Sequence, residues 1–69
     1  MRDRYLHTMI ECAQEDADRV YTALLEAIGA SLNLCLNGDP QKADWLLCAD
    51  LALTYTRLND EIKRLEALP

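Results

Sequence analysis

A chain of 69 residues forms one domain at most, and a domain this small buries a modest share of its surface when it folds alone. Acidic residues outnumber basic ones 12 to 7, and this net charge of −5 argues against nucleic acid and anionic membranes as partners. Apolar residues make up 51% of the chain, with two glycines and two prolines, which favours a folded helical domain over disorder.

The first predicted element is a long amphipathic helix over about residues 3–36. Gly29 is its weak point, because glycine costs about 1 kcal/mol relative to alanine inside a helix. A kink or break near residues 29–31 is therefore the alternative to one continuous helix. Apolar or small side chains recur along the helix in alternating steps of four and three, which is the spacing of a heptad repeat. They are Leu6, Ile10, Ala13, Ala17, Val20, Leu24, Ala27, Ser31 and Leu34.

A turn is predicted at residues 37–40. Gly38 is the residue type that ends a helix in the left-handed conformation. Asp39 suits a helix N-cap, and Pro40 suits the first helical position, where its missing N–H costs nothing. We therefore expect a second helix over about residues 40–67. Because short connections join antiparallel neighbours, the predicted fold is an all-α, two-helix hairpin that spans residues 1–69 as a single domain.

The second helix carries more apolar surface than one hairpin can bury. A helical projection predicts a stripe that packs on the first helix, made of Cys48, Leu51, Tyr55, Leu58, Ile62 and Leu65, with Leu47 nearby. The opposite side of residues 45–53 is apolar as well, and exposed apolar surface of this kind usually marks an interface. One interpretation is a homodimer in which two hairpins form a four-helix bundle. The residues assigned to this dimer interface are Tyr21, Leu25, Ile28, Leu32, Leu46 and Leu53.

The other interpretation is that part of the same surface binds a different protein. Trp45 is the expected anchor, since tryptophan is enriched in interface hot spots. Asp44 and Asp50 would frame it with negative charge, which suits a groove with basic edges. The two interpretations are compatible if the dimer takes up the leucines and leaves Trp45 at its rim. The candidate protein-binding residues are Asp44, Trp45, Leu46, Ala49, Asp50, Ala52 and Leu53.

Catalytic and metal-binding patterns are missing from the sequence. It has no Ser/His/Asp set, no glycine-rich phosphate loop and no Glu-x-x-His pair, so we expect a protein that is not an enzyme and that holds no cofactor or metal. The single histidine is His7, and Cys12, Cys35 and Cys48 lack Cys-x-x-Cys spacing, which predicts free thiols packed as small core residues. Without a signal peptide or an apolar run long enough to span a bilayer, the expected location is the cytoplasm.

The size, the acidity and the predicted hairpin resemble those of the small quorum-sensing anti-activators that bacteriophages encode. The resemblance covers the whole chain and implies a helical dimer that binds a LuxR-type transcriptional activator and blocks its DNA binding. It also implies binding to the assembly ATPase of type IV pili. Such a protein would act in the host bacterial cytoplasm, with its contacts in the region of Trp45.

Two other families offer alternatives. The segment Gly38-Asp39-Pro40, followed by Trp45 and Ala52-Leu53, is similar to the turn and helix of co-chaperones of type III secretion needle subunits. Ala43 stands near the place of the tyrosine that is usual in that family. The hairpin architecture is also similar to that of a plasmid RNA-binding regulator of copy number, although RNA binding needs a basic face that this chain lacks.

Overall fold

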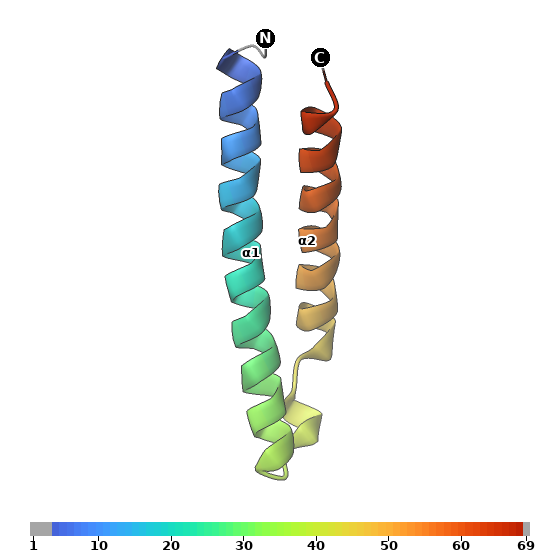
Figure 1. Ribbon diagram of the computed structural model, residues 1–69. Coiled ribbons are helices and arrows are strands. Elements are labelled where there is room, and N and C mark those ends of the chain that lie inside the picture. The colour runs from blue at the N-terminus through green and yellow to red at the C-terminus, as the bar shows by residue number, and fades with distance from the viewer. Residues whose placement is uncertain (1–3, 69) are drawn as a thin grey trace.

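The computed structural model describes residues 4–68, which form two long antiparallel helices and a short connection (Figure 1). Helix α1 spans Arg4–Leu36, the 3-10 helix η1 spans Pro40–Lys42, and α2 spans Trp45–Glu66. No strand occurs within these described residues. The first and last described residues lie together at one end, called here the open end, and the connection forms the opposite, turn end. The prediction of an all-helical hairpin is confirmed.

Helix α1 runs without interruption through Gly29. The alternative of a break near residues 29–31 is therefore wrong. The surrounding alanines and leucines favour helix strongly enough to offset the cost of a single glycine. The predicted end at residue 36 is confirmed, and the predicted start at residue 3 lies outside the described residues.

Gly38 ends α1 as predicted. Its φ of 86° lies in the left-handed region that glycine adopts without a steric penalty. The N–H of Asp39 donates to the carbonyl of Leu34 at 2.8 Å, and the N–H of Gly38 donates to the carbonyl of Cys35 at 3.2 Å. These two hydrogen bonds make a Schellman motif, which satisfies carbonyls that the last turn of a helix would otherwise leave unpaired.

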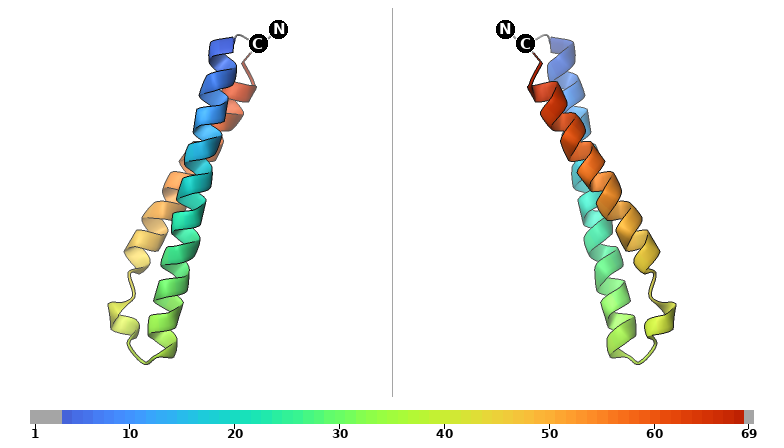
Figure 2. Two further views of the ribbon diagram at one scale, coloured as in Figure 1. Left: turned by 90° about the vertical axis from the view of Figure 1, so that its left-hand side faces the viewer. Right: turned by 90° about the vertical axis from the view of Figure 1, so that its right-hand side faces the viewer.

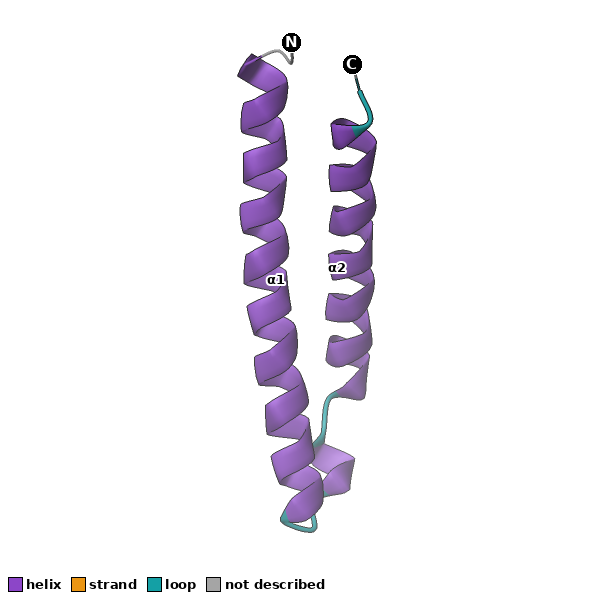
Figure 3. Ribbon diagram, in the orientation of Figure 1, coloured by secondary structure: helices purple, strands orange, loops and turns teal. Residues whose placement is uncertain are grey.

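Helix α2 begins later than the sequence pattern predicts, and the predicted start at residue 40 is wrong. Pro40 opens only the single turn of η1, and the side chain of Asp39 makes no capping hydrogen bond. The chain then becomes extended at Ala43 and enters α2 at Trp45 (Figure 3). The cap is Asp44, whose Oδ1 accepts a hydrogen bond from the N–H of Leu47 at 2.9 Å.

Replacement of Asp44 by alanine should lower the free energy of unfolding by about 1 kcal/mol, because the N–H of Leu47 would lose its acceptor. The control is Asp44→Asn, which keeps a capping oxygen and should remain close to the wild type. Urea denaturation at a single protein concentration measures both variants. Equal losses for the two would show that the negative charge, and not the cap, makes the contribution.

The two predicted apolar stripes face each other, and apart from Leu47 their residues are buried or half-buried. The large side chains that are buried all lie toward the open end, where Leu6 and Ile10 of α1 pack with Leu65 of α2. Toward the turn end, the buried residues are the small Ser31 and Cys48, whose Oγ and Sγ atoms lie 3.9 Å apart. The hairpin is therefore packed more tightly at its open end than at its turn end.

The molecule is long and thin. Its extents are 56 × 14 × 11 Å, and Figure 2 shows the helices diverging toward the turn end. The radius of gyration is 16.2 Å, against about 11 Å for a compact domain of this length. The accessible surface is 5292 Å², against about 4,400 Å² for a compact monomer of this mass. The excess is therefore about 900 Å² of surface that a single compact chain would bury.

Candidate protein-interaction surfaces

Exposed apolar side chains gather toward the turn end. Within residues 4–68, eleven large apolar side chains are exposed, and eight of them belong to residues 21–53. We call these eight the turn-proximal surface, and their exposed fractions run from 45% to 83%. They are Tyr21, Leu25, Leu32, Leu36, Trp45, Leu46, Leu47 and Leu53.

Leu47 is a correction to the helical projection, which placed it on the buried side of α2. It is 46% exposed. The adjacent Cys48 is buried, with its Sγ 3.9 Å from Ser31 Oγ of α1, so in the first turn of α2 the side that faces α1 is centred on Cys48 and leaves Leu47 uncovered.

Charged side chains, unlike the exposed apolar ones, gather toward the open end. Residues 20–36 carry one charged side chain, Glu26, and residues 45–56 carry one, Asp50. The open-end segments 4–19 and 57–66 carry six each. Helical segments that are apolar nearly all round are normally covered on every side. Here the more apolar half of each helix is the less buried half. We call these two segments, residues 20–36 of α1 and 45–56 of α2, the turn-proximal half.

The hydroxyl groups of this half do little to make it polar. Thr54 Oγ1 donates to the carbonyl of Asp50 at 2.8 Å, and Thr56 Oγ1 donates to the carbonyl of Ala52 at 3.0 Å. Both hydroxyls are thus satisfied within their own helix. The outward chemistry of the turn-proximal half is therefore mainly that of methyl groups and aromatic rings.

One broad side of the hairpin is marked by a pair of tyrosines. The rings of Tyr21 and Tyr55 lie 5.3 Å apart at an angle of 38°, which joins α1 to α2 on this side. Residues at helical spacing from each tyrosine continue the same side toward the turn end. We call this side the tyrosine face. Its members are Tyr21, Leu25, Ile28 and Leu32 of α1, and Trp45, Ala52 and Tyr55 of α2.

A second, narrower surface lies on α2 alone. At about 100° per residue, Leu53 falls about 180° from the buried Ile62, so it points away from α1. Leu46 lies seven residues earlier on the same line and is 80% exposed. We call this line the outer ridge. Its members are Leu46, Ala49, Asp50 and Leu53, all of which are exposed.

The structure thus separates residues that the sequence grouped together. The predicted dimer set divides, because its α1 members lie on the tyrosine face whereas Leu46 and Leu53 lie on the outer ridge. The predicted partner set divides too, since Trp45 and Ala52 belong to the tyrosine face. Asp44 has a structural task as the cap of α2.

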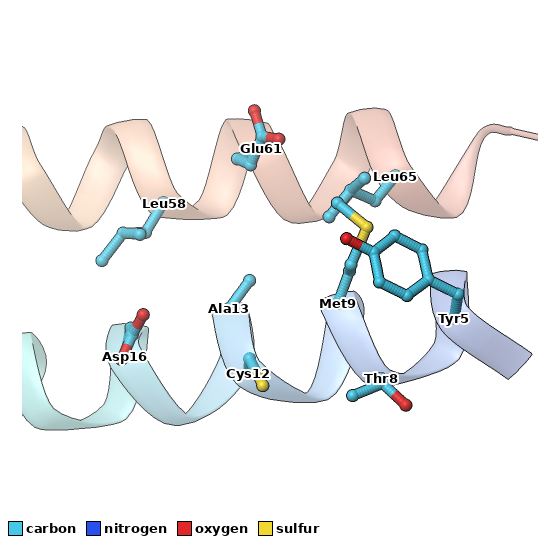
Figure 4. A pocket seen from close by; sticks show the side chains of 9 residues that line it. All are labelled: Tyr5, Thr8, Met9, Cys12, Ala13, Asp16, Leu58, Glu61 and Leu65. Atoms are coloured by element: carbon cyan, nitrogen blue, oxygen red, sulfur yellow. The ribbon is translucent and has the colours of Figure 1, made fainter.

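A third apolar surface was not predicted. An open groove of about 470 Å³ runs between the helices at the open end (Figure 4). The missed signal is the stripe Tyr5, Met9, Cys12 and Asp16, which repeats at helical spacing beside the heptad stripe of α1. The groove is lined by Tyr5, Thr8, Met9, Cys12, Ala13, Asp16, Leu58, Glu61 and Leu65.

Acidic groups at this groove already have basic partners. Asp16 lies 3.3 Å from Arg19, and Glu61 forms a hydrogen-bonded ion pair with Arg64. The hydrogen bond and the charge of Glu61 raise the pKa of the Arg64 guanidinium, which stays cationic. Each of these two carboxylates therefore has its charge partly balanced by a basic neighbour, and such exposed pairs contribute little to stability.

The potential metal ligands and the thiols are scattered over the described residues. No group of three potential ligands could hold a metal ion within the described residues. His7 is exposed and pairs with Glu11 at 2.8 Å. All three cysteines are free thiols. The prediction that they serve as core residues is confirmed for the buried Cys48, whereas Cys12 is exposed because it lies on the groove side of α1.

Neither described helix combines the length and the apolar character that a bilayer crossing requires.

Comparisons were made with protein-family models, curated proteins and solved structures, and none of these matches the chain.

Proposed function

We propose that this protein is a non-catalytic inhibitor that binds another protein through its turn-proximal surface. The observation that carries the proposal is the coincidence of eight exposed large apolar side chains with helical segments that hold one charge each. An apolar surface of this extent is usually an interaction site in a protein that stays in solution.

The outer ridge is the part that best suits a foreign partner. It is one helix wide, and an amphipathic helix binds a partner by laying its apolar side into a groove. Leu46 is 80% exposed, so its transfer into such a groove would break few contacts within this chain, and a fully buried leucine contributes about 1.5–3 kcal/mol. Asp50 beside it favours a groove with basic edges.

The resemblance to phage-encoded anti-activators supplies the class of target. We propose a LuxR-type transcriptional activator of quorum sensing, held in a form that does not bind DNA, with a pilus assembly ATPase as a second target. The inhibitor would be phage-encoded and act in the host bacterial cytoplasm. Its mechanism would be steric, because the ridge would occupy a surface that the target needs for its own function.

The RNA-binding alternative is disfavoured by the distribution of basic residues. Lys42 is the sole Lys or Arg of residues 20–56, so the turn-proximal half could neutralise few phosphates. The co-chaperone alternative shares the apolar surface and differs in its partner, a secretion needle subunit.

Purified LuxR-type activators bound to fluorescent operator DNA test the proposal by anisotropy. The wild-type protein should release the DNA, and Leu46→Gln should raise the concentration required by at least about tenfold, since one lost leucine contact amounts to more than 1.4 kcal/mol. The matched control is Leu68→Gln, at a position that is 46% exposed at the open end and lies outside the turn-proximal surface, and this variant should act as the wild type does. If an excess of protein leaves every activator on its DNA, and it instead keeps a needle subunit from aggregating, the co-chaperone alternative is correct.

A further inference from the structure

We infer that a second copy of this chain covers the tyrosine face, so that two turn-proximal halves overlap and form a four-helix bundle. This inference does not rest on the proposed function. It concerns the self-association of the hairpin in the absence of any target.

The area of uncovered surface fits this occupant. The chain exposes 5292 Å², about 900 Å² more than a compact monomer of its mass. A stable interface of standard size buries about 800 Å² on each partner. One copy therefore has about as much surplus surface as one side of a dimer needs.

The width of the face points to a hairpin as the partner. Both helices contribute to the tyrosine face, α1 through Leu25 and Leu32 and α2 through Trp45 and Ala52. A face two helices wide is matched by another face two helices wide, which is how two hairpins make a four-helix bundle. The outer ridge, by contrast, comes from one helix and is turned away from this side of the hairpin.

The charges select which parts of the two copies meet. Each chain has a net charge of −5, so two copies repel each other in general. The tyrosine face carries no Asp, Glu, Lys, Arg or His, and the charged residues of the helical segments around it are Glu26 and Asp50. A symmetric dimer places the same patch on both subunits, and an uncharged apolar patch is complementary to itself. Overlap of a turn-proximal half with an open end would instead bury carboxylates against leucines.

In this arrangement the residues exchange the roles that the sequence predicted for them, in which the dimer took up Leu46 and Leu53 and left Trp45 at its rim. Trp45 then belongs to the interface between copies, and Leu46 and Leu53 remain available on the outer ridge. A dimer would present two such ridges.

Two substitutions of the same kind test the face. Leu25 and Leu53 are 52% and 49% exposed, and they lie on the tyrosine face and the outer ridge respectively. Sedimentation equilibrium of the full chain should give twice 7.8 kDa for the wild type and for Leu53→Glu. Leu25→Glu should raise the dimer dissociation constant at least about 100-fold, because it buries an unpaired carboxylate in the interface.

Circular dichroism verifies that each variant remains helical, and Leu32→Glu, at a position 50% exposed on the same face, replaces Leu25→Glu if that variant unfolds. A wild-type protein that stays monomeric at high micromolar concentration overturns the inference. So does a Leu53→Glu variant that dissociates as readily as Leu25→Glu, since the ridge would then belong to the interface. Neither measurement involves the activator or its DNA, so loss of the dimer and loss of inhibition are separate results.

Discussion

Truncation of Leu65 to alanine should lower the free energy of unfolding by about 2–4 kcal/mol. Leu65 is 7% exposed and packs with Leu6 and Ile10 in the buried cluster at the open end. The loss combines the transfer of the removed methyl groups to water with the cavity that they leave. A domain of 69 residues has about 3–10 kcal/mol of stability in total, so this one change could halve it or unfold the protein.

The matched control is Leu46→Ala, which makes the same chemical change at the other end of α2. Leu46 is 80% exposed, so the expected change in stability is within about 0.5 kcal/mol. Urea denaturation of both variants at one protein concentration measures the difference, and a fixed concentration is needed because dimerisation also stabilises the fold. Equal stability of the two variants would mean that the open-end cluster does not hold the helices together.

The two glycines should respond to alanine in opposite directions. At Gly38 the φ of 86° places a Cβ in a strained conformation, so Gly38→Ala should cost about 1–2 kcal/mol. At Gly29 an added Cβ would meet nothing within 4 Å in the interior of α1. Gly29→Ala should therefore stabilise the protein by about 0.5–1 kcal/mol, through the loss of backbone freedom in the unfolded chain.

Each variant serves as the control for the other, since the chemical change is identical. For a domain of this size, 1 kcal/mol shifts the midpoint of thermal unfolding by about 4–8 °C. Gly38→Ala should melt lower than the wild type, and Gly29→Ala should melt higher. If Gly29→Ala also melts lower, a neighbouring chain approaches α1 at this position.

The sequence by itself determined the helices and how they face each other. Heptad spacing selected one stripe that begins at Leu6 and ends at Leu34 and another that begins at Cys48 and ends at Leu65. The residues at the heptad positions of these two stripes are all buried or half-buried. Gly38 marked the end of α1 to within two residues. These features are local: helical periodicity and the conformational freedom of glycine depend only on near neighbours in the chain.

The tertiary structure alone decided the remaining features. Asp39 and Pro40 are residue types that favour a helix start, yet α2 begins at Trp45. The chain must first cross from the end of α1 to the position beside α1 where the second helix packs. Leu47 is exposed because α1 covers the side of α2 that carries Cys48, and the groove beside Met9 exists because α2 leaves that side of α1 uncovered. The separation of the tyrosine face from the outer ridge has the same origin. A helical projection gives the direction of each side chain around its own axis, but only the placement of the second helix shows which directions are covered.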